Sequence, residues 1–288
     1  MIVTDNFNDI YKELIKTVMT GNESSPRGMP VRELLGVQFT LTNPRRSLCT
    51  IRGRKLNYKF AIIEKMEYAS GVSNPKVLCH YNKNMSHFTN ERGEFDGAYG
   101  PRIDRQLEYV YDLLKRDPDT RQAVININNE SDKRETRDVP CTLNLQFLLR
   151  NDKLNLIVTM RSNDLLWGTP YDVNGFCFLQ ELMATWLGVD LGHYIHFAGS
   201  LHIYQDRIEE LQKLIDDRQE VDEESPRIQQ FDFKDRRVVF DTFWHVQRQI
   251  QEENIKSPES LLKGLDLEYS LTQFAVPTFI KKYLARLL

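Results

Sequence analysis

The most informative segment of this chain is Met160-Arg161-Ser162-Asn163-Asp164-Leu165-Leu166-Trp167-Gly168-Thr169-Pro170-Tyr171-Asp172, which is dense in polar groups and lies between two apolar segments. Arg161 and Ser162 could bind a phosphate, the guanidinium through a bidentate fork and the hydroxyl as a donor. The alternative for Arg161 is a surface salt bridge with Asp164. The polar segment therefore connects a predicted strand before it to a predicted helix after it.

Apolar residues on either side of this segment predict regular structure. Alternation predicts strands over residues 123–127, 143–149 and 154–160, and a short strand over 194–197. Helical spacing predicts helices over residues 7–18, 59–70, 102–116, 173–186 and 206–217, and a basic amphipathic helix over 277–288. Residues 80–99 have little periodicity and are expected to form a long ordered loop. The chain has no repeat and no clear internal boundary, so we expect one α/β domain.

The composition is that of a soluble globular protein, with 41% apolar and 27% charged residues. The net charge is −3, so no overall positive field draws the chain to nucleic acid or membrane. The 4 cysteines are widely spaced, which argues against a disulfide framework or a zinc site and fits a reducing compartment. The first residues lack a signal-peptide pattern, and no apolar run reaches membrane-spanning length. We therefore expect a cytoplasmic protein without a metal site.

Cys141 is the candidate nucleophile. It follows Pro140 at the start of a predicted strand, with Arg134 and Arg137 shortly before it. Nearby positive charge lowers the pKa of a thiol and makes the cysteine a better nucleophile. Most free cysteines, however, are small buried hydrophobic residues, and this alternative stands for Cys141 when it is considered alone.

Several further motifs surround Cys141 and the polar segment. In the chain they are Pro140-Cys141, Arg161-Ser162-x-Asp164, Gly168-x-Pro170-Tyr171-Asp172 and His202-x-Tyr204, together with Glu64 seven residues before Gly71, Tyr99-Gly100 and Asp117-Pro118-Asp119-x-Arg121. In their order and spacing they resemble the motifs of the thymidylate synthase family. The match covers most of residues 27–204. The resemblance implies a single α/β (α+β) domain over residues 1–288, in which a mixed β-sheet forms the dimer interface and helices pack around it. Residues from about 218 to 288 would be a divergent C-terminal extension of that domain.

The resemblance also implies a role for each matching residue in a folate-dependent transfer to C5 of a pyrimidine nucleotide. Cys141 would add to C6 of the ring, Glu64 would organise water and move protons, and Tyr99 would assist proton removal from C5. Ligand binding would fall to the other residues: Arg161, Ser162 and Arg27 for the 5′-phosphate, His202 and Tyr204 for the sugar, and Asp164, Trp167 and Gly168 for 5,10-methylenetetrahydrofolate. Arg121 would reach the phosphate from the other subunit, which makes a homodimer obligatory.

Asp172 departs from the methylating members of the family, which have asparagine at this position. The asparagine amide matches uracil, because it donates to O4 and accepts from N3–H. Cytosine presents the opposite edge, with a donor at N4 and an acceptor at N3. A carboxylate accepts from N4 and its protonated form donates to N3; alternatively, N3 takes the proton and Asp172 stays negative. Asp172 therefore favours a cytidine nucleotide, and within the family the resemblance is to (deoxy)cytidylate 5-hydroxymethylases.

In such an enzyme, water rather than hydride adds to the exocyclic methylene on C5, and Glu64 is the candidate that orients it. The alternatives are a C5-methyltransferase, a uridylate hydroxymethylase, and a non-catalytic nucleotide- or RNA-binding relative. Further departures from the family are Gln122 in place of a second arginine, Thr142 after the nucleophile, and Gly175 in place of serine. We expect Gly175 to relax the sugar or base pocket, which leaves both dCMP and CMP open as substrates. Phage DNA modification and a bacterial biosynthetic pathway are both open as settings.

Overall fold

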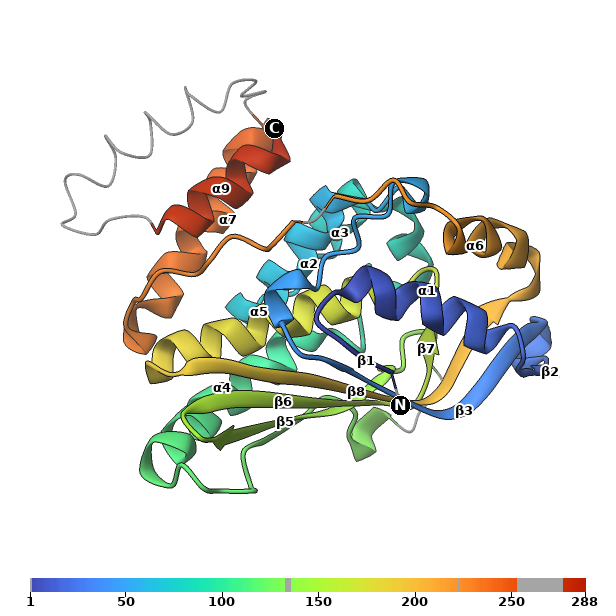
Figure 1. Cartoon of the computed structure of the whole chain (residues 1–288). Coiled ribbons are helices and arrows are strands. Elements are labelled where there is room, and N and C mark those ends of the chain that lie inside the picture. Colours follow the sequence, from blue (N-terminus) through green and yellow to red (C-terminus); the bar gives the residue numbers. More distant parts are fainter. Residues whose placement is uncertain (1, 133–135, 222, 253–276) are drawn as a thin grey trace. The chain divides into compact units, whose positions relative to one another are not determined.

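The computed structural model describes residues 2–132, 136–221, 223–252 and 277–288 (Figure 1). Arg134, and the parts of the expected C-terminal extension at residues 222 and 253–276, lie outside the described residues. Two compact units, residues 1–225 and residues 226–288, make up the chain, and each is considered by itself. None of the described helices is both long and apolar enough to cross a membrane.

One mixed sheet runs through residues 1–225. Its strand β8 (Asp190–Tyr204) pairs antiparallel with β3 (Val31–Leu41) on one side and parallel with β6 (Lys153–Met160) on the other. Antiparallel strands β5 (Thr142–Arg150) and β4 (Val124–Asn126) continue the sheet beyond β6. Three short strands complete it: β1 (Ile2–Thr4) and β2 (Asn22–Ser24) pair with β3, and β7 (Asn163–Asp164) pairs with β8. The expected mixed sheet is confirmed.

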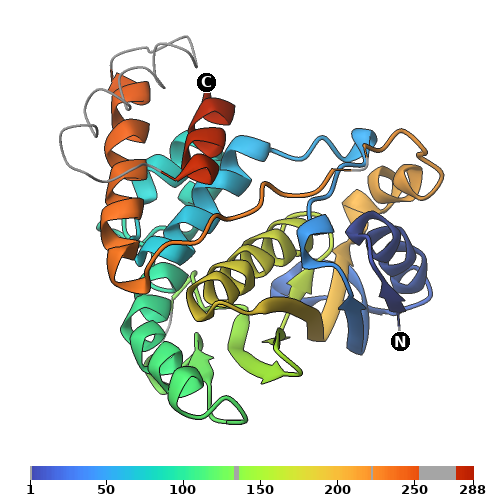
Figure 2. The same cartoon turned by 60° about the vertical axis from the view of Figure 1, so that its left-hand side comes forward.

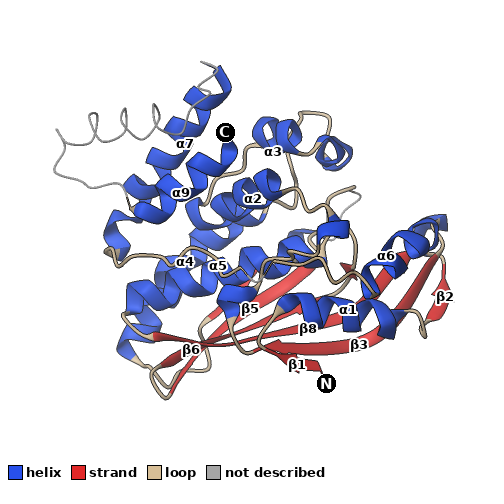
Figure 3. Cartoon of the chain, turned by 45° about the horizontal axis from the view of Figure 1, so that its top comes forward, coloured by secondary structure: helices blue, strands red, loops and turns tan. Residues whose placement is uncertain are grey.

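Helices cover one face of this sheet (Figure 3). α1 (Phe7–Val18) begins at Asn6, whose side chain accepts a hydrogen bond from the Asn8 N–H, and its apolar side is buried against β3. α5 (Thr169–Leu187) is buried around nearly its whole circumference. It packs on β6 and β8 on one side and on α2 (Tyr58–Ser70) and α4 (Tyr99–Arg116) on the other (Figures 1 and 2). α2 ends at Gly71, whose φ of 75° suits glycine.

The two faces of β8 differ in burial, as the period of two in a strand requires. Tyr194, His196 and Ala198 point to the helices and are buried, whereas Phe197 on the other face is 37% exposed. On neighbouring β3, Leu35 is 74% exposed. Large apolar side chains are therefore accessible on the sheet strands as well as packed beneath the helices.

The predicted helices over 7–18, 59–70, 102–116, 173–186 and 206–217 are confirmed by α1, α2, α4, α5 and α6 (Ile208–Ile215). The strand expected over 194–197 is confirmed as part of β8, but its predicted bounds are too short. β8 is longer because hydrogen bonds to β3 and β6 on its two edges extend through Gly192 and Gly199, which interrupt the apolar alternation. β3 was not predicted, since Gly36 and polar residues break its pattern. Residues 80–99 are mostly loop, with the end of α3 (Pro75–Tyr81) and the 3₁₀ turn η4 (Lys83–Phe88).

Residues 226–288 contain α7 (Arg236–Glu252) and α9 (Thr278–Leu287), which pack against each other (Figure 1). α9 confirms the helix expected over 277–288, and its apolar side buries Phe279 and Tyr283. α7 is not among the predicted helices, although Val239, Phe243 and Val246 recur at helical spacing and are buried.

Candidate active site

The adjoining ends of β5 and β6 place Cys141 beside Arg161. The carbonyl of Cys141 accepts a 2.8 Å hydrogen bond from the Arg161 backbone N–H. The Arg161 side chain then returns to the residues before Cys141, where Nε donates to the Pro140 carbonyl at 3.0 Å and Nη2 to the Val139 carbonyl at 2.9 Å. The guanidinium thus fixes the backbone that leads to Cys141, instead of pairing with Asp164, and Arg161 as a whole remains exposed.

Burial raises the pKa of the Cys141 thiol above its ordinary value. The charges of Asp172 and Asp138 raise it further, whereas those of Arg161 and Arg27 lower it. The expected lowering of this pKa by nearby positive charge is therefore present, but burial outweighs it and the net pKa is raised. A thiol of this kind needs a neighbouring base or a polarised substrate in order to react.

Tyr99, the first residue of α4, lies next to the nucleophile. Its hydroxyl accepts a 3.1 Å hydrogen bond from the N–H of Thr142, and burial together with the charge of Cys141 raises its pKa. Its ring stacks on that of Tyr68 from α2 with centroids 5.5 Å apart, and Tyr68 stacks in turn on Phe176 of α5 at 5.6 Å. The stacked rings hold Tyr99 beside Cys141, where the expected role requires it.

Glu64 lies one helical turn before Tyr68 on α2. Burial raises the pKa of Glu64 well above the usual carboxylate range, and the charges of Asp172 and Glu67 raise it further, whereas a hydrogen bond from the Tyr68 hydroxyl lowers it. A carboxyl group with a raised pKa retains its proton closer to neutral pH and can exchange it there. The structure therefore brings Glu64 and Asp172 together and adds Tyr68 as a partner.

Gly175 on α5 faces the ring of Tyr68. A Cβ atom at Gly175 would lie 2.8 Å from Cε2 and 3.1 Å from Cδ2 of that ring. The first distance is shorter than a carbon–carbon contact allows. The space that a serine side chain would use is thus occupied by an aromatic ring, and the expectation that Gly175 relaxes the pocket is wrong.

Asp172 lies in the first turn of α5, where the helix dipole favours an anion. Its Oδ2 accepts a 2.8 Å hydrogen bond from Nδ2 of Asn163. Burial raises the pKa of Asp172 to about 6, the charge of Asp164 adds to the rise, and the Asn163 hydrogen bond opposes it. The carboxyl group is therefore mostly ionised at pH 7 and can gain a proton within a small range of pH. Gly168 allows close approach, since a Cβ there would lie 3.0 Å from Oδ2.

Asp164 has one oxygen with partners and one without. Its Oδ1 accepts hydrogen bonds from the N–H groups of Leu166, at 2.7 Å, and of Trp167. Its Oδ2 is buried without a hydrogen-bond partner among the described residues and lies 3.9 Å from Nε2 of His202. Leaving a buried carboxylate oxygen unpaired is costly, so this atom suits a donor group on a ligand.

Trp167, three residues after Asp164, is 47% exposed. The Arg207 guanidinium lies 5.7 Å from the centroid of its indole ring. A cavity of about 530 Å³ lies beside it and is lined by Met29, Pro30, Trp167, Tyr204, Gln205, Asp206 and Arg207. An exposed aromatic face near an unpaired carboxylate oxygen suits a flat heterocycle that carries N–H donors.

An early turn brings Arg27 to the end of β8. Arg27 has a φ of 56°, a conformation that few residues other than glycine adopt. Burial raises the pKa of Tyr204 and the nearby Arg27 lowers it, and the charge of Arg27 also acts on Cys141. The ring of His202 meets that of Tyr204 edge-on, with centroids 5.6 Å apart. The expected sugar pair and the early-loop arginine therefore come together.

Ser162 and Arg121 were also expected to bind the phosphate, but the structure gives them fewer contacts with the site than Arg161 and Arg27 have. Ser162 is half-buried and directly follows Arg161. Arg121 is exposed between α4 and β4, and its backbone carbonyl accepts a hydrogen bond from Gln146 of β5. The described contacts join Arg161 and Arg27 to Cys141, and Arg121 takes no part in them.

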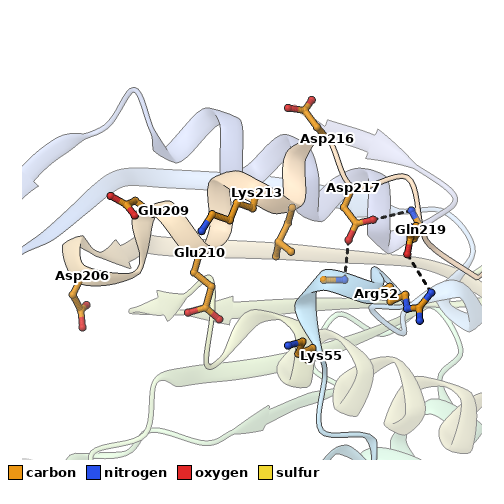
Figure 4. A pocket seen from close by; sticks show the side chains of 11 residues that line it. Arg52, Lys55, Asp206, Glu209, Glu210, Lys213, Asp216, Asp217 and Gln219 are labelled. Carbon is orange, nitrogen blue, oxygen red and sulfur yellow. Dashed lines mark hydrogen bonds between the residues drawn. The ribbon is translucent and has the colours of Figure 1, made fainter.

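A second cavity, of about 790 Å³, lies between α6 and the turn η3 (Arg52–Arg54) (Figure 4). Asp217 connects the two sides, since its Oδ2 accepts from the Gly53 N–H at 2.8 Å and its Oδ1 from the Gln219 N–H at 2.8 Å. The charged side chains around it carry both signs: Arg52, Lys55, Lys213, Asp206, Glu209, Glu210, Asp216 and Asp217. This cavity contains none of the expected site residues and is a separate surface feature.

Four residues of the site were not predicted: Tyr68, Asn163, Tyr194 and His196. Tyr68 follows Glu64 at the i, i+4 spacing that places two side chains on one helix face. Asn163 lies between Ser162 and Asp164, within the polar segment at residues 160–172. Its polar side chain could have been considered, but no role was assigned to it. Tyr194 and His196 are two residues apart in a predicted strand, so their side chains lie on the same face of the sheet. This spacing could have indicated that the two act together.

The sequence of this chain is similar to those of several known proteins. Residues 9–254 match the family model described as thymidylate synthase. A deoxyuridylate hydroxymethyltransferase of Bacillus phage SP01 is 37% identical over 248 residues, which are 77% of this chain and 64% of that protein. Another from Delftia phage PhiW-14 is 31% identical over 215 residues (68% and 59%), and a thymidylate synthase of Corynebacterium aurimucosum is 28% identical over 222 residues (70% and 80%). The chain thus spans about three fifths of the length of the two phage relatives. By the family match over most of its length, the chain belongs to the thymidylate synthase family.

Proposed function

We propose that this protein hydroxymethylates C5 of a cytidine 5′-monophosphate, dCMP or CMP, with 5,10-methylenetetrahydrofolate as cofactor. The observation that carries the proposal is Asp172, a buried acid with a pKa of about 6 whose charge acts on both Cys141 and Glu64. Family membership supports one-carbon transfer to a pyrimidine, and the names of the two phage relatives support a hydroxymethyl product. Those names refer to uridylate, so the choice of cytosine rests on Asp172.

Cys141 would start the reaction. Its Sγ would add to C6 of the base, so that the electrons of the C5–C6 double bond make C5 nucleophilic. Bound 5,10-methylenetetrahydrofolate supplies the one-carbon unit that C5 accepts. Tyr99, beside Cys141, would assist removal of the C5 proton. The electrons of that C–H bond would form the exocyclic methylene on C5 as the bond from the one-carbon unit to the folate nitrogen breaks and tetrahydrofolate leaves.

Glu64 would complete the reaction with water. It would orient a water molecule at the exocyclic methylene on C5 and take its proton as the C–O bond forms. The electrons that reach C5 would then re-form the C5–C6 double bond and release the thiolate of Cys141. The raised pKa of Glu64 supports this role, because the group can hold the proton that it receives.

The residues present fit a folate. Oδ2 of Asp164, which has no hydrogen-bond partner among the described residues, would accept from N–H groups of the pterin. Trp167 would offer its exposed ring face to the heterocycle, and Gly168 would contact the cofactor beside it. Each of these contacts would orient the cofactor over the base.

The nucleotide would be held by its phosphate and its sugar. Arg161, Ser162 and Arg27 would bind the 5′-phosphate, and His202 and Tyr204 would bind the sugar hydroxyl. Arg121 would come from a second subunit, in a homodimer formed through the open face of the sheet. The exposure of Arg121 and of the apolar side chains on β3 and β8 supports this arrangement.

Domain organisation and location belong to the same proposal. We take both compact units as one catalytic domain, since the family match runs across the boundary at residue 225. Within that domain, residues from about 218 onward would be the divergent extension. The relatives and the functional assignment favour action in the cytoplasm of a bacterium or of a phage-infected host.

A second candidate function is hydroxymethylation of dUMP, which the names of the two phage relatives favour. A methyl product, formed when hydride replaces water, is favoured by the thymidylate synthase relative. A purely binding role is disfavoured because Cys141 and Glu64 are both present in the site.

The test incubates the full chain with 5,10-methylenetetrahydrofolate and, separately, dCMP, CMP and dUMP, and identifies the products by mass. A hydroxymethylated cytidine nucleotide is expected, and the ratio of the dCMP and CMP rates identifies the sugar. Turnover of dUMP alone, or dihydrofolate with a methylated base, would contradict the proposal. Cys141→Ser should abolish turnover and retain nucleotide binding.

A further inference from the structure

A buried chain of polar side chains runs from β8 to Asp172. Oη of Tyr194 lies 2.8 Å from Nδ1 of His196. Nε2 of His196 lies 3.1 Å from Oδ1 of Asn163, whose Nδ2 donates to Asp172. Tyr194 and His196 are fully buried and Asn163 is 2% exposed. Phe39 stacks on the imidazole at 4.7 Å and 7°, so the plane of that ring is fixed.

The proton positions in this chain follow from its chemistry. Burial lowers the pKa of His196 to about 3, so the imidazole is neutral and carries one proton. The amide oxygen of Asn163 can only accept, which places that proton on Nε2 and leaves Nδ1 to accept from the Tyr194 hydroxyl. Oγ1 of Thr169 lies 2.9 Å from the same amide oxygen and 2.8 Å from the Asp164 carbonyl, so these two acceptors compete for its one proton. With its oxygen accepting from Nε2 of His196, Asn163 presents its NH₂ group to Asp172.

We propose that Asn163, oriented by His196, is a positioning residue that sets base specificity by holding Asp172 in its ionised form. The inference rests on the proposed function. A protonated carboxyl group pairs with either base, because it can accept from N3–H and donate to O4 of uracil, or accept from N4–H and donate to N3 of cytosine. A carboxylate only accepts. It therefore suits cytosine protonated at N3, which offers two donors, and it opposes O4 of uracil.

The other titratable groups around Asp172 do not favour its ionised form. The titratable groups electrostatically coupled to Asp172 come from several elements: Glu64 and Tyr68 of α2, Tyr99 of α4, Cys141 before β5, Asp164 of β7 and Tyr194 of β8. None of them is positively charged: when ionised, Glu64, Cys141 and Asp164 favour a protonated Asp172 or a cationic base, whereas the three tyrosines, whose pKa values burial raises, are neutral. Among the described side chains, Asn163 donates the hydrogen bond that opposes protonation of Asp172. Without this hydrogen bond, a larger fraction of Asp172 is protonated, and uracil can then pair with the protonated carboxyl group.

The test replaces Asn163 with leucine, which has a similar shape and no donor. In Asn163→Leu, the ratio of kcat/KM for dCMP to that for dUMP is expected to fall by roughly tenfold or more, because a hydrogen bond to a charged group is lost. Tyr194→Phe removes the hydroxyl that donates to Nδ1 of His196 and so weakens the orientation of the imidazole; it should change the ratio in the same direction by less. Tyr11→Phe is the matched control, since its hydroxyl is equally buried but donates to the Leu165 carbonyl at 2.8 Å. Its ratio should equal that of the unmodified chain.

A second measurement does not depend on turnover. Carbon-13 NMR of labelled aspartate carboxyl groups follows the titration of Asp172 in the nucleotide-free protein, and Asp172→Asn identifies the signal. The pKa of Asp172 should rise in Asn163→Leu and, by less, in Tyr194→Phe, which carries both measurements if the leucine variant does not fold. An unchanged ratio with an unchanged titration would overturn the inference. Preference of the unmodified chain for dUMP would overturn the proposed substrate, whereas the titration would still report directly on whether Asn163 holds Asp172 ionised.

Discussion

The two sides of Asp172 are built differently. On the strand side, Asn163 and His196 have hydrogen-bond partners for their side-chain polar groups, and burial keeps the imidazole neutral. On the α2 side, the pKa of Glu64 is raised by burial and by the neighbouring charges of Asp172 and Glu67. One side therefore has a single favoured proton arrangement, whereas the other contains groups that exchange protons.

This difference separates recognition from proton transfer. A fully paired buried network resists rearrangement, because any rotation leaves a polar atom without a partner. A buried carboxyl group with like charges nearby gains and loses its proton at higher pH than usual. The strand side is thus suited to reading the base, and the α2 side to moving protons and water.

The largest expected effect comes from removing the acid on the α2 side. Glu64→Gln keeps the shape of the side chain but removes its proton exchange, so kcat should fall by about 10²–10⁴-fold while nucleotide binding persists. Steady-state kinetics and a binding titration measure the two effects. Glu67→Gln is the matched control on the same helix. Because the pKa of Glu67 is about 8, this group is mostly protonated at neutral pH, so its replacement changes little charge near Glu64 and kcat at pH 7 should stay within about threefold of the unmodified chain. Turnover close to normal in Glu64→Gln would contradict the division between the two sides.

The next effect concerns the packing that supports the α2 side. Gly175→Ser would push its Cβ against the Tyr68 ring, and it should lower the free energy of unfolding by about 1–3 kcal/mol. Urea denaturation measures this change. In the double variant with Tyr68→Leu, the two losses should not add, because the smaller side chain relieves the clash. Additive losses would show that Gly175 and Tyr68 do not interact.

A smaller effect is expected when only the Tyr68 hydroxyl is removed. Tyr68→Phe keeps the stack with Tyr99 and Phe176 but loses the hydrogen bond that lowers the pKa of Glu64. The pKa of Glu64 should therefore rise further, and the limb of the kcat profile that reports it should move to higher pH. The loss in kcat at neutral pH should be about tenfold or less. A profile that does not move would place Tyr68 in packing alone.

The smallest effect is on the pH dependence of stability. Burial raises the pKa of Glu67 from 4.5 to about 8 in the folded chain. The folded state therefore binds more protons than the unfolded state between these values, so stability is fully present below about pH 4.5 and decreases as pH rises through 8. Glu67→Gln removes this dependence and retains an oxygen for the Asn74 N–H. The drop in Tm between acidic and alkaline buffer should be smaller in Glu67→Gln, and an equal drop would contradict the assignment.

Local patterns in the sequence were sufficient for much of the fold. Helical spacing over 59–70 and 173–186 and alternation over 143–149 and 154–160 report which face of a segment is apolar, and this face depends on neighbouring residues alone. β8 exceeded its predicted bounds because its length depends on hydrogen bonds to β3 and β6, which are distant in the sequence.

The sequence by itself determined the chemical groups of the site: a cysteine after proline, the Arg161-Ser162 pair, and an acid at Asp172. Only the tertiary structure decided how these groups behave. Burial raises the pKa of Cys141 despite two arginines, and desolvation depends on the whole surrounding fold. The contacts of Asn163 with His196 and of Gly175 with Tyr68 likewise join residues far apart in the chain, so no local pattern contains them.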